Sequence, residues 1–202
     1  MARRILLLNE RDPKHPLAGG AEIHLFEIFS RLAMRGYEIT HLAASFRDGK
    51  REDEVMGVRV RRLANRYAYY GLVPFFARSE AATGRYDVVV DALNKLPFFS
   101  PWTTRLPCFA IAHHLFGTTA FRQVSFPVAL VTWASEKLIP TAYRRTPILA
   151  ISPSTKDDLV ARGIAPSNVW VVPPGVDLVV YRLSGTLDER EPIVVWVGRL
   201  EP

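Results

Sequence analysis

The sequence predicts an α/β protein built on a doubly wound, mainly parallel sheet that is flanked by helices. Short apolar runs without polar alternation recur along the chain, as expected of strands that are covered on both faces. Amphipathic stretches with helical spacing separate these runs, and glycines or prolines stand at their boundaries. Strands and helices that alternate in this way are typical of parallel sheets with right-handed crossovers.

The first half of the chain contains three apolar runs and two stretches with helical spacing. In chain order these predict strand 5–9, a helix from about residue 21 that stops at Gly36, strand 38–44, strand 58–63 and a helix over 69–82. Residues 58–63 alternate apolar and basic side chains, which favours an edge strand.

The second half repeats the pattern. The expected elements are strand 87–91, strand 108–112, an apolar helical segment over 124–145 that opens near Pro127 and breaks near Pro140, strand 147–151, a helix from Pro153 to Gly163, and strand 169–172. Ser152 precedes Pro153 as an N-cap precedes a proline at the first helical position.

A further buried strand is expected at residues 193–197, after a polar and turn-rich stretch. Such a strand needs neighbours on both sides, so we expect it to open a second domain. The predicted organisation is a domain over 1–175, an interdomain linker over 176–192 and the first strand of a truncated domain over 193–202.

Composition restricts the class of protein. The sequence is 49% hydrophobic and 23% charged, which excludes a disordered or collagen-like chain. A net charge of +6 favours anionic partners, but the basic residues are scattered, so nucleic-acid binding is not expected. The lone Cys108 excludes an internal disulfide and fits a reducing compartment. Because no apolar run is long enough for a membrane span, we expect a cytoplasmic protein.

Three sets of residues follow strands at their carboxyl ends, where doubly wound sheets bind ligands. Gly19 and Gly20 allow backbone N–H groups and a helix N-terminus to approach an anion, but a flexible turn explains them equally well. His113 and His114 follow strand 108–112 and suit hydrogen bonding to a ligand oxygen, or a purely structural role. Arg199 follows strand 193–197 and suits phosphate, or is a surface arginine. The spacing of the glycines is not that of a nicotinamide or flavin site.

Five segments in order resemble the amino-terminal half of the retaining glycosyltransferases of family 4, which have the two-domain GT-B fold with Rossmann-like halves. These segments are Gly-Gly-Ala-Glu at 19–22, AIAHH at 110–114, ILAISPSTKDDLVARGI at 148–164, VWVVPPGVD at 169–177 and VVWVGRLEP at 194–202. The resemblance implies an acceptor-binding domain of an enzyme that uses a nucleotide-sugar donor without a metal or other cofactor.

The resemblance also implies roles for single residues. Gly19, Gly20 and Arg199 fall where the family binds the donor diphosphate, and His113 falls where a catalytic histidine faces the donor sugar. A second set matches the acceptor or substrate region: Glu22, His114 and Ser152. Which of the two adjacent histidines acts stays open. The remainder of the donor domain would be the missing partner, so we expect the chain alone to be inactive.

Two questions stay open at this stage. The acceptor is a lipid-linked sugar, a polysaccharide or a small molecule; residues 10–17 and the aromatic cluster at 67–76 are candidates to line its site. With a lipid-linked acceptor, a basic group would face the inner membrane surface: Arg59, Arg61, Arg62 and Arg66. The alternative to an enzyme is a free-standing module that binds a phosphorylated ligand or an anionic lipid without catalysis.

Overall fold

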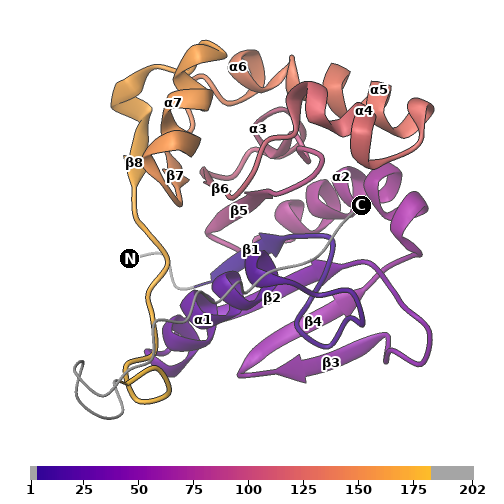
Figure 1. Cartoon of the computed structure of the whole chain (residues 1–202). Coiled ribbons are helices and arrows are strands. Elements are labelled where there is room, and N and C mark those ends of the chain that lie inside the picture. Colours follow the sequence, from indigo (N-terminus) through magenta and orange to yellow (C-terminus); the bar gives the residue numbers. More distant parts are fainter. Residues whose placement is uncertain (1–3, 183–202) are drawn as a thin grey trace.

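An eight-stranded sheet forms the centre of the structure, a computed structural model that describes residues 4–182 (Figure 1). The strands are β1 (Arg4–Leu8), β2 (Glu38–Ala43), β3 (Glu52–Val55), β4 (Val58–Arg62), β5 (Val88–Leu93), β6 (Cys108–Ala112), β7 (Ile148–Ala150) and β8 (Val169–Val171). Their order across the sheet is β3-β4-β2-β1-β5-β6-β7-β8, and only the β3–β4 pair is antiparallel. The predicted α/β, Rossmann-like fold is confirmed.

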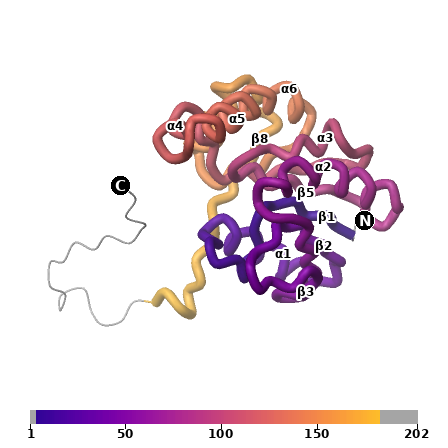
Figure 2. The backbone as a smooth tube through the Cα atoms, turned by 90° about the vertical axis from the view of Figure 1, so that its right-hand side faces the viewer, coloured from indigo at the N-terminus to yellow at the C-terminus, as the bar shows by residue number. Residues whose placement is uncertain are grey.

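Helices cover both faces of this sheet. They are α1 (Gly20–Met34), α2 (Arg66–Ala82), α3 (Ser100–Thr103), α4 (Ala120–Gln123), α5 (Phe126–Glu136), α6 (Ile139–Ala142) and α7 (Pro153–Ala161), with 3₁₀ turns η1 (Gly117–Thr119) and η2 (Pro166–Asn168). Figure 2 shows α4, α5 and α6 gathered at the end of the sheet away from β3. The two long helices α1 and α2 pack on opposite faces of the central strands.

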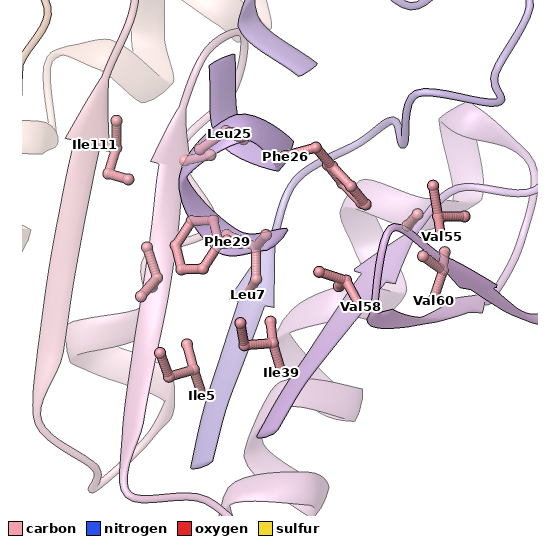
Figure 3. Packing of buried hydrophobic residues seen from close by; sticks show 13 residues of the cluster. Ile5, Leu7, Leu25, Phe26, Phe29, Ile39, Val55, Val58, Val60 and Ile111 are labelled. Atoms are coloured by element: carbon pink, nitrogen blue, oxygen red, sulfur yellow. The ribbon is translucent and has the colours of Figure 1, made fainter. Parts of the chain in front are cut away.

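The core beneath α1 explains why this helix forms where it does. Leu25 and Phe29 of α1 lie over Leu7 and Ile5 of β1, and all four side chains are buried (Figure 3). Phe26 extends the same cluster toward the β3–β4 hairpin. Burying each of these side chains stabilises the fold by about 1.5–3 kcal/mol, so packing rather than helix propensity holds α1 in place.

The alternate residues of β1 face α2. Leu6 and Leu8 pack against Tyr69 and Val73 of that helix, and none of the four side chains is exposed. Because β1 is buried on both faces, it has no polar alternation, as the apolar run in the sequence predicted. Tyr69 also donates its hydroxyl to the carbonyl of Asn9, which fixes the exit of β1 to the start of α2.

The predicted edge strand is not at the edge. Residues 58–63 do form a strand, β4, but β3 pairs with it on the outside in an antiparallel hairpin. The β3 sequence EDEV has poor strand propensity, so local pattern did not reveal it. Two of its residues lie opposite arginines of β4, Glu52 opposite Arg61 and Glu54 opposite Arg59, and its Val55 is buried in the core cluster beneath α1.

Most of the other elements follow the prediction, including the break expected near Pro140. The segment over 124–145 forms two helices, α5 and α6; Pro127 lies in the first turn of α5 and Pro140 in the first turn of α6. Ser152 caps α7 by accepting the Thr155 N–H at 3.1 Å, as its position before Pro153 predicted. The short helices α3 and α4 were not predicted.

The proposed basic face for a membrane is contradicted in part. Arg62 is 2% exposed and forms a bidentate ion pair with Asp12 at 2.8 and 2.9 Å. Arg62 is therefore not available to lipid headgroups, whereas Arg61 is paired with Glu80 but keeps a partly exposed side chain. Within residues 4–182, no helix combines the length and the apolar character that crossing a bilayer requires. The expected strand over 193–197, most of the linker and Arg199 lie outside the described residues.

Candidate functional site

The glycine loop lies at the carboxyl edge of the sheet, where β1 leads into α1. Gly19 is the N-cap of α1 with extended backbone, and its N–H donates to Glu22 Oε2 at 2.7 Å. The other oxygen of Glu22 accepts from Asn94 Nδ2, 3.3 Å away in the loop after β5. Glu22 is 3% exposed, so this carboxylate acts as a buried clamp between the glycine loop and the neighbouring strand.

Gly20 opens α1 and has no steric reason to be a glycine within the described chain. A Cβ built on it meets no atom within 4 Å, and its backbone is not in the left-handed region. The first turn of α1 therefore presents its backbone N–H groups beside open space, at the positive end of the helix dipole. Such a position suits the close approach of an anion.

His113 follows β6 directly, as predicted, and is held at this edge. Its backbone N–H donates to the carbonyl of Leu93 at 3.1 Å, and its side chain is buried with Nε2 3.0 Å from Nδ1 of His24. Nδ1 of His113 is also buried and has no hydrogen-bond partner within residues 4–182. One ring nitrogen is therefore occupied by His24, and the other is available to a ligand.

Burial is the main reason why both imidazoles are neutral. Burial, together with the neighbouring His24 ring, lowers the pKa of His113 to about 4, and burial also lowers the pKa of His24. At neutral pH the pair is thus uncharged, and one facing nitrogen donates to the other. A neutral His113 acts through hydrogen bonding and not as a cation.

The pattern of the sequence did not reveal His24. It recurs on the polar side of the α1 stripe and is separated from His113 by 89 positions, so only the fold brings the two rings together. The ring centroids are 5.2 Å apart in an edge-to-face arrangement. Its place in the second turn of a helix that begins at the sheet edge is the one available hint.

The other predicted residues lie further from this pair. His114 is exposed, and its ring packs edge-on against Phe116 at a centroid distance of 4.8 Å. Ser152 follows β7, one strand beyond β6, and its hydroxyl is engaged in capping α7. The structure thus brings together Gly19, Gly20, Glu22 and His113, and it places His114 and Ser152 along the same edge.

Two further features concern metal ligands and the single cysteine. The described chain gathers no group of three or more His, Cys, Asp or Glu side chains that could hold a metal ion. Cys108 is half-buried at the start of β6, and burial raises the pKa of its thiol. A thiol with a raised pKa is a poor nucleophile.

A groove of about 1040 Å³ lies elsewhere, near the amino ends of the strands. Arg4 and Glu38, at the first positions of β1 and β2, contribute to its wall. Arg4 is paired with Asp87 at 2.7 Å. Because ligands of doubly wound sheets bind at the carboxyl edge, we assign the functional site to the glycine loop and His113 and not to this groove.

Residues 18–180 match the model of the family described as Glycosyltransferase Family 4. This match covers most of the chain and includes the glycine loop and His113. The chain belongs to glycosyltransferase family 4. No match to it was found among curated proteins.

Among solved structures, this family 4 chain is similar to HepE (Alr3699) of Anabaena. The similarity holds for crystal structures of HepE with UDP and glucose (TM-score 0.55, 18% identity), with UDP-glucose and with UDP (each TM-score 0.53, 19% identity). The alignments cover 90% of this chain and 46–47% of HepE, so the chain spans about half the length of these structures. At this identity the likeness supports the fold alone.

Proposed function

We propose that this chain is the acceptor-binding, amino-terminal domain of a retaining glycosyltransferase that transfers a sugar from a nucleotide-sugar donor. The observation that carries the proposal is the convergence of the glycine loop and a neutral, half-satisfied His113 at one edge of a family 4 domain. The complexes of HepE with UDP and UDP-glucose support a uridine nucleotide sugar as the first donor to test.

In the proposed mechanism the donor diphosphate approaches Gly19 and Gly20 at the start of α1. Departure of the nucleoside diphosphate builds negative charge, and the N–H groups and dipole of a helix N-terminus stabilise such charge without a metal. Arg199, which lies outside the described residues, would add a bidentate cation from the second domain. Glu22 keeps the glycine loop in position by holding the Gly19 N–H.

His113 is proposed as the catalytic residue that contacts the donor sugar. Its Nδ1 is buried and unpartnered, so a sugar hydroxyl at that nitrogen would complete its hydrogen bonding. His24 is proposed as a positioning residue, because its contact with Nε2 orients the His113 ring. His114 is exposed beside it and is proposed, with Ser152, for the acceptor side of the edge.

Calorimetric titration with UDP-glucose tests this proposal. The 202-residue chain and a longer version that carries a donor-binding domain are titrated in parallel, with NADH as a negative control. We expect binding by the longer protein alone, because most donor contacts would come from the second domain. Tight binding by the 202-residue chain would overturn the proposal in favour of a self-contained nucleotide-binding module. A product whose anomeric configuration is inverted, detected by proton NMR, would refute the retaining mechanism.

A further inference from the structure

The strand order singles out one crevice in this sheet. The chain goes from β1 to β2 and β4 on one side, and then crosses to β5 on the other side of β1. The direction of winding therefore reverses between β1 and β5, and open α/β sheets bind ligands outside the carboxyl ends of the strands at such a point. Glu10 and Arg11 follow β1 there, and Lys95 lies just past the end of β5.

A buried carboxylate at this point is surrounded by cations. Glu10 is 3% exposed; its Oε2 accepts from Lys95 Nζ at 2.6 Å and from the Tyr70 hydroxyl at 3.0 Å. Its Oε1 has Arg11 Nε at 3.6 Å and Arg66 Nε at 3.5 Å, and forms no hydrogen bond. We call these residues the Glu10 cluster: Glu10, Arg11, Arg66 and Lys95.

The Glu10 cluster has more positive than negative charge. Three cations face one carboxylate, and even with the nearby Glu22 counted, three cations stand against two carboxylates. Asp12 does not neutralise these cations, because Arg62 donates to both of its carboxylate oxygens. His15 adds no opposing charge, and burial, followed by the charge of Arg11, lowers the pKa of its ring.

Part of the donor capacity of the cluster is unused. Arg11 Nε is buried without a hydrogen-bond partner within the described chain. The side chains of Lys95 and Arg66 are 25% and 45% exposed, so both can reach a ligand in the crevice while they remain beside Glu10. Burial lowers the pKa of Lys95, because removal from water disfavours its charged form. A second anion beside the ammonium group would favour the charged form.

We propose that the Glu10 cluster binds an oxyanion, a phosphate or a carboxylate, carried by the acceptor. Lys95 supplies a point charge and Arg66 a planar pair of donors, while Glu10 keeps both side chains in place before the ligand binds. This inference rests on the proposed function, in which the crevice receives the acceptor, and it deepens that proposal by naming the acceptor as anionic.

The Glu10 cluster is separate from the glycine loop. Glu10 bonds to Tyr70 of α2, on the face of the sheet that α2 covers, whereas Gly19 and Glu22 belong to the start of α1 on the opposite face. The crevice thus has an α2 side with side-chain cations and an α1 side with backbone N–H groups. A donor diphosphate and an anionic acceptor group would bind on different sides.

The test is an NMR titration of the 202-residue chain with inorganic phosphate and, separately, with acetate at constant ionic strength. We expect saturable shifts of signals from the Glu10 cluster, and affinity at least about 10-fold weaker in Lys95→Met and in Arg66→Gln. Lys137→Met, the same substitution at the C-cap of α5, is the matched control and should bind like the unaltered chain. If only phosphate binds, the acceptor group is assigned as a phosphate. If acetate binds as well, the site accepts both phosphates and carboxylates.

Glu10→Gln gives an opposite and more discriminating expectation. Removing the internal counterion raises the net charge of the cluster, so phosphate should bind several-fold more tightly. The inference is overturned if the unaltered chain shows no shift at the cluster, or if Lys95→Met and Arg66→Gln both bind phosphate unchanged. No nucleotide sugar is present in this titration. Phosphate binding here, together with a longer protein that binds no UDP-glucose, would therefore overturn the proposed function and leave the anion site intact.

Discussion

Acidification should destabilise this chain through its buried, neutral histidines. The pKa of His113 is about 4 in the fold, against about 6.5 in an unfolded chain. Between these values the unfolded state binds a proton that the folded state rejects, so stability is fully present above about pH 6.5 and is lost as the pH falls toward 4. For one such group the free energy of unfolding should fall by about 2 kcal/mol between pH 7 and pH 5.

Urea titration of the unaltered chain and of His113→Gln at both pH values measures this contribution. Glutamine retains hydrogen-bonding capacity but does not titrate, so His113→Gln should lose about 2 kcal/mol less than the unaltered chain on going to pH 5. His41 is the internal comparison, since burial also lowers its pKa to about 4, and His41→Gln should behave in the same way. The readout is the fall in the free energy of unfolding between pH 7 and pH 5, compared between the variant and the unaltered chain. Groups common to both proteins cancel in this comparison, including Asp91, whose pKa is raised by burial. If the free energy of unfolding of His113→Gln fell between pH 7 and pH 5 by as much as that of the unaltered chain, the idea that burial and His24 keep this ring neutral would be refuted.

Three further outcomes are expected. Gly20→Ala should leave the urea midpoint unchanged or slightly raised, because a Cβ there meets no atom within 4 Å. The same variant of the longer protein should bind UDP-glucose more weakly. Equal binding of the donor by both proteins would count against the diphosphate role of the loop. Arg62→Met should cost about 3–5 kcal/mol by leaving the buried Asp12 without its ion partner, whereas Asp12→Ala should cost less because Arg62 keeps Asp53 at 3.2 Å. The double variant should cost less than the sum of the two, and strict additivity in a double-mutant cycle would contradict a direct pair. Ser152→Ala should cost about 1 kcal/mol through loss of the α7 cap, and a wild-type midpoint would show that the cap is dispensable.

The sequence predicted the parts of the fold that depend on local pattern. Apolar runs identified most parallel strands of the described chain, because strands buried on both faces are predominantly apolar, and β4 was found by its alternation of apolar and basic side chains. The strand β3 was missed because its residues EDEV have no strand pattern of their own, and its place depends on the register with β4 and on the burial of Val55. For the same reason β4 was wrongly predicted at the edge.

The candidate site was predictable only where it follows directly from strand ends. His113 and the glycine loop were found because the carboxyl ends of parallel strands meet at one edge. Lys95 and His24 were not found, because their significance depends on which strands are neighbours and on which helix covers which face. Glu10 and Lys95 meet since β5 crosses to the far side of β1, and no local pattern encodes that crossing.

The division of the crevice has a chemical consequence for the proposed transfer. A donor diphosphate and an anionic acceptor repel each other, and a single cationic pocket would let either occupy the place of the other. Here the α1 side offers a helix N-terminus and a neutral His113, whereas side-chain cations lie on the α2 side around Glu10. Because backbone N–H groups cannot move and long cationic side chains can, the α1 side suits a leaving group in a fixed position and the α2 side suits an acceptor that enters and leaves.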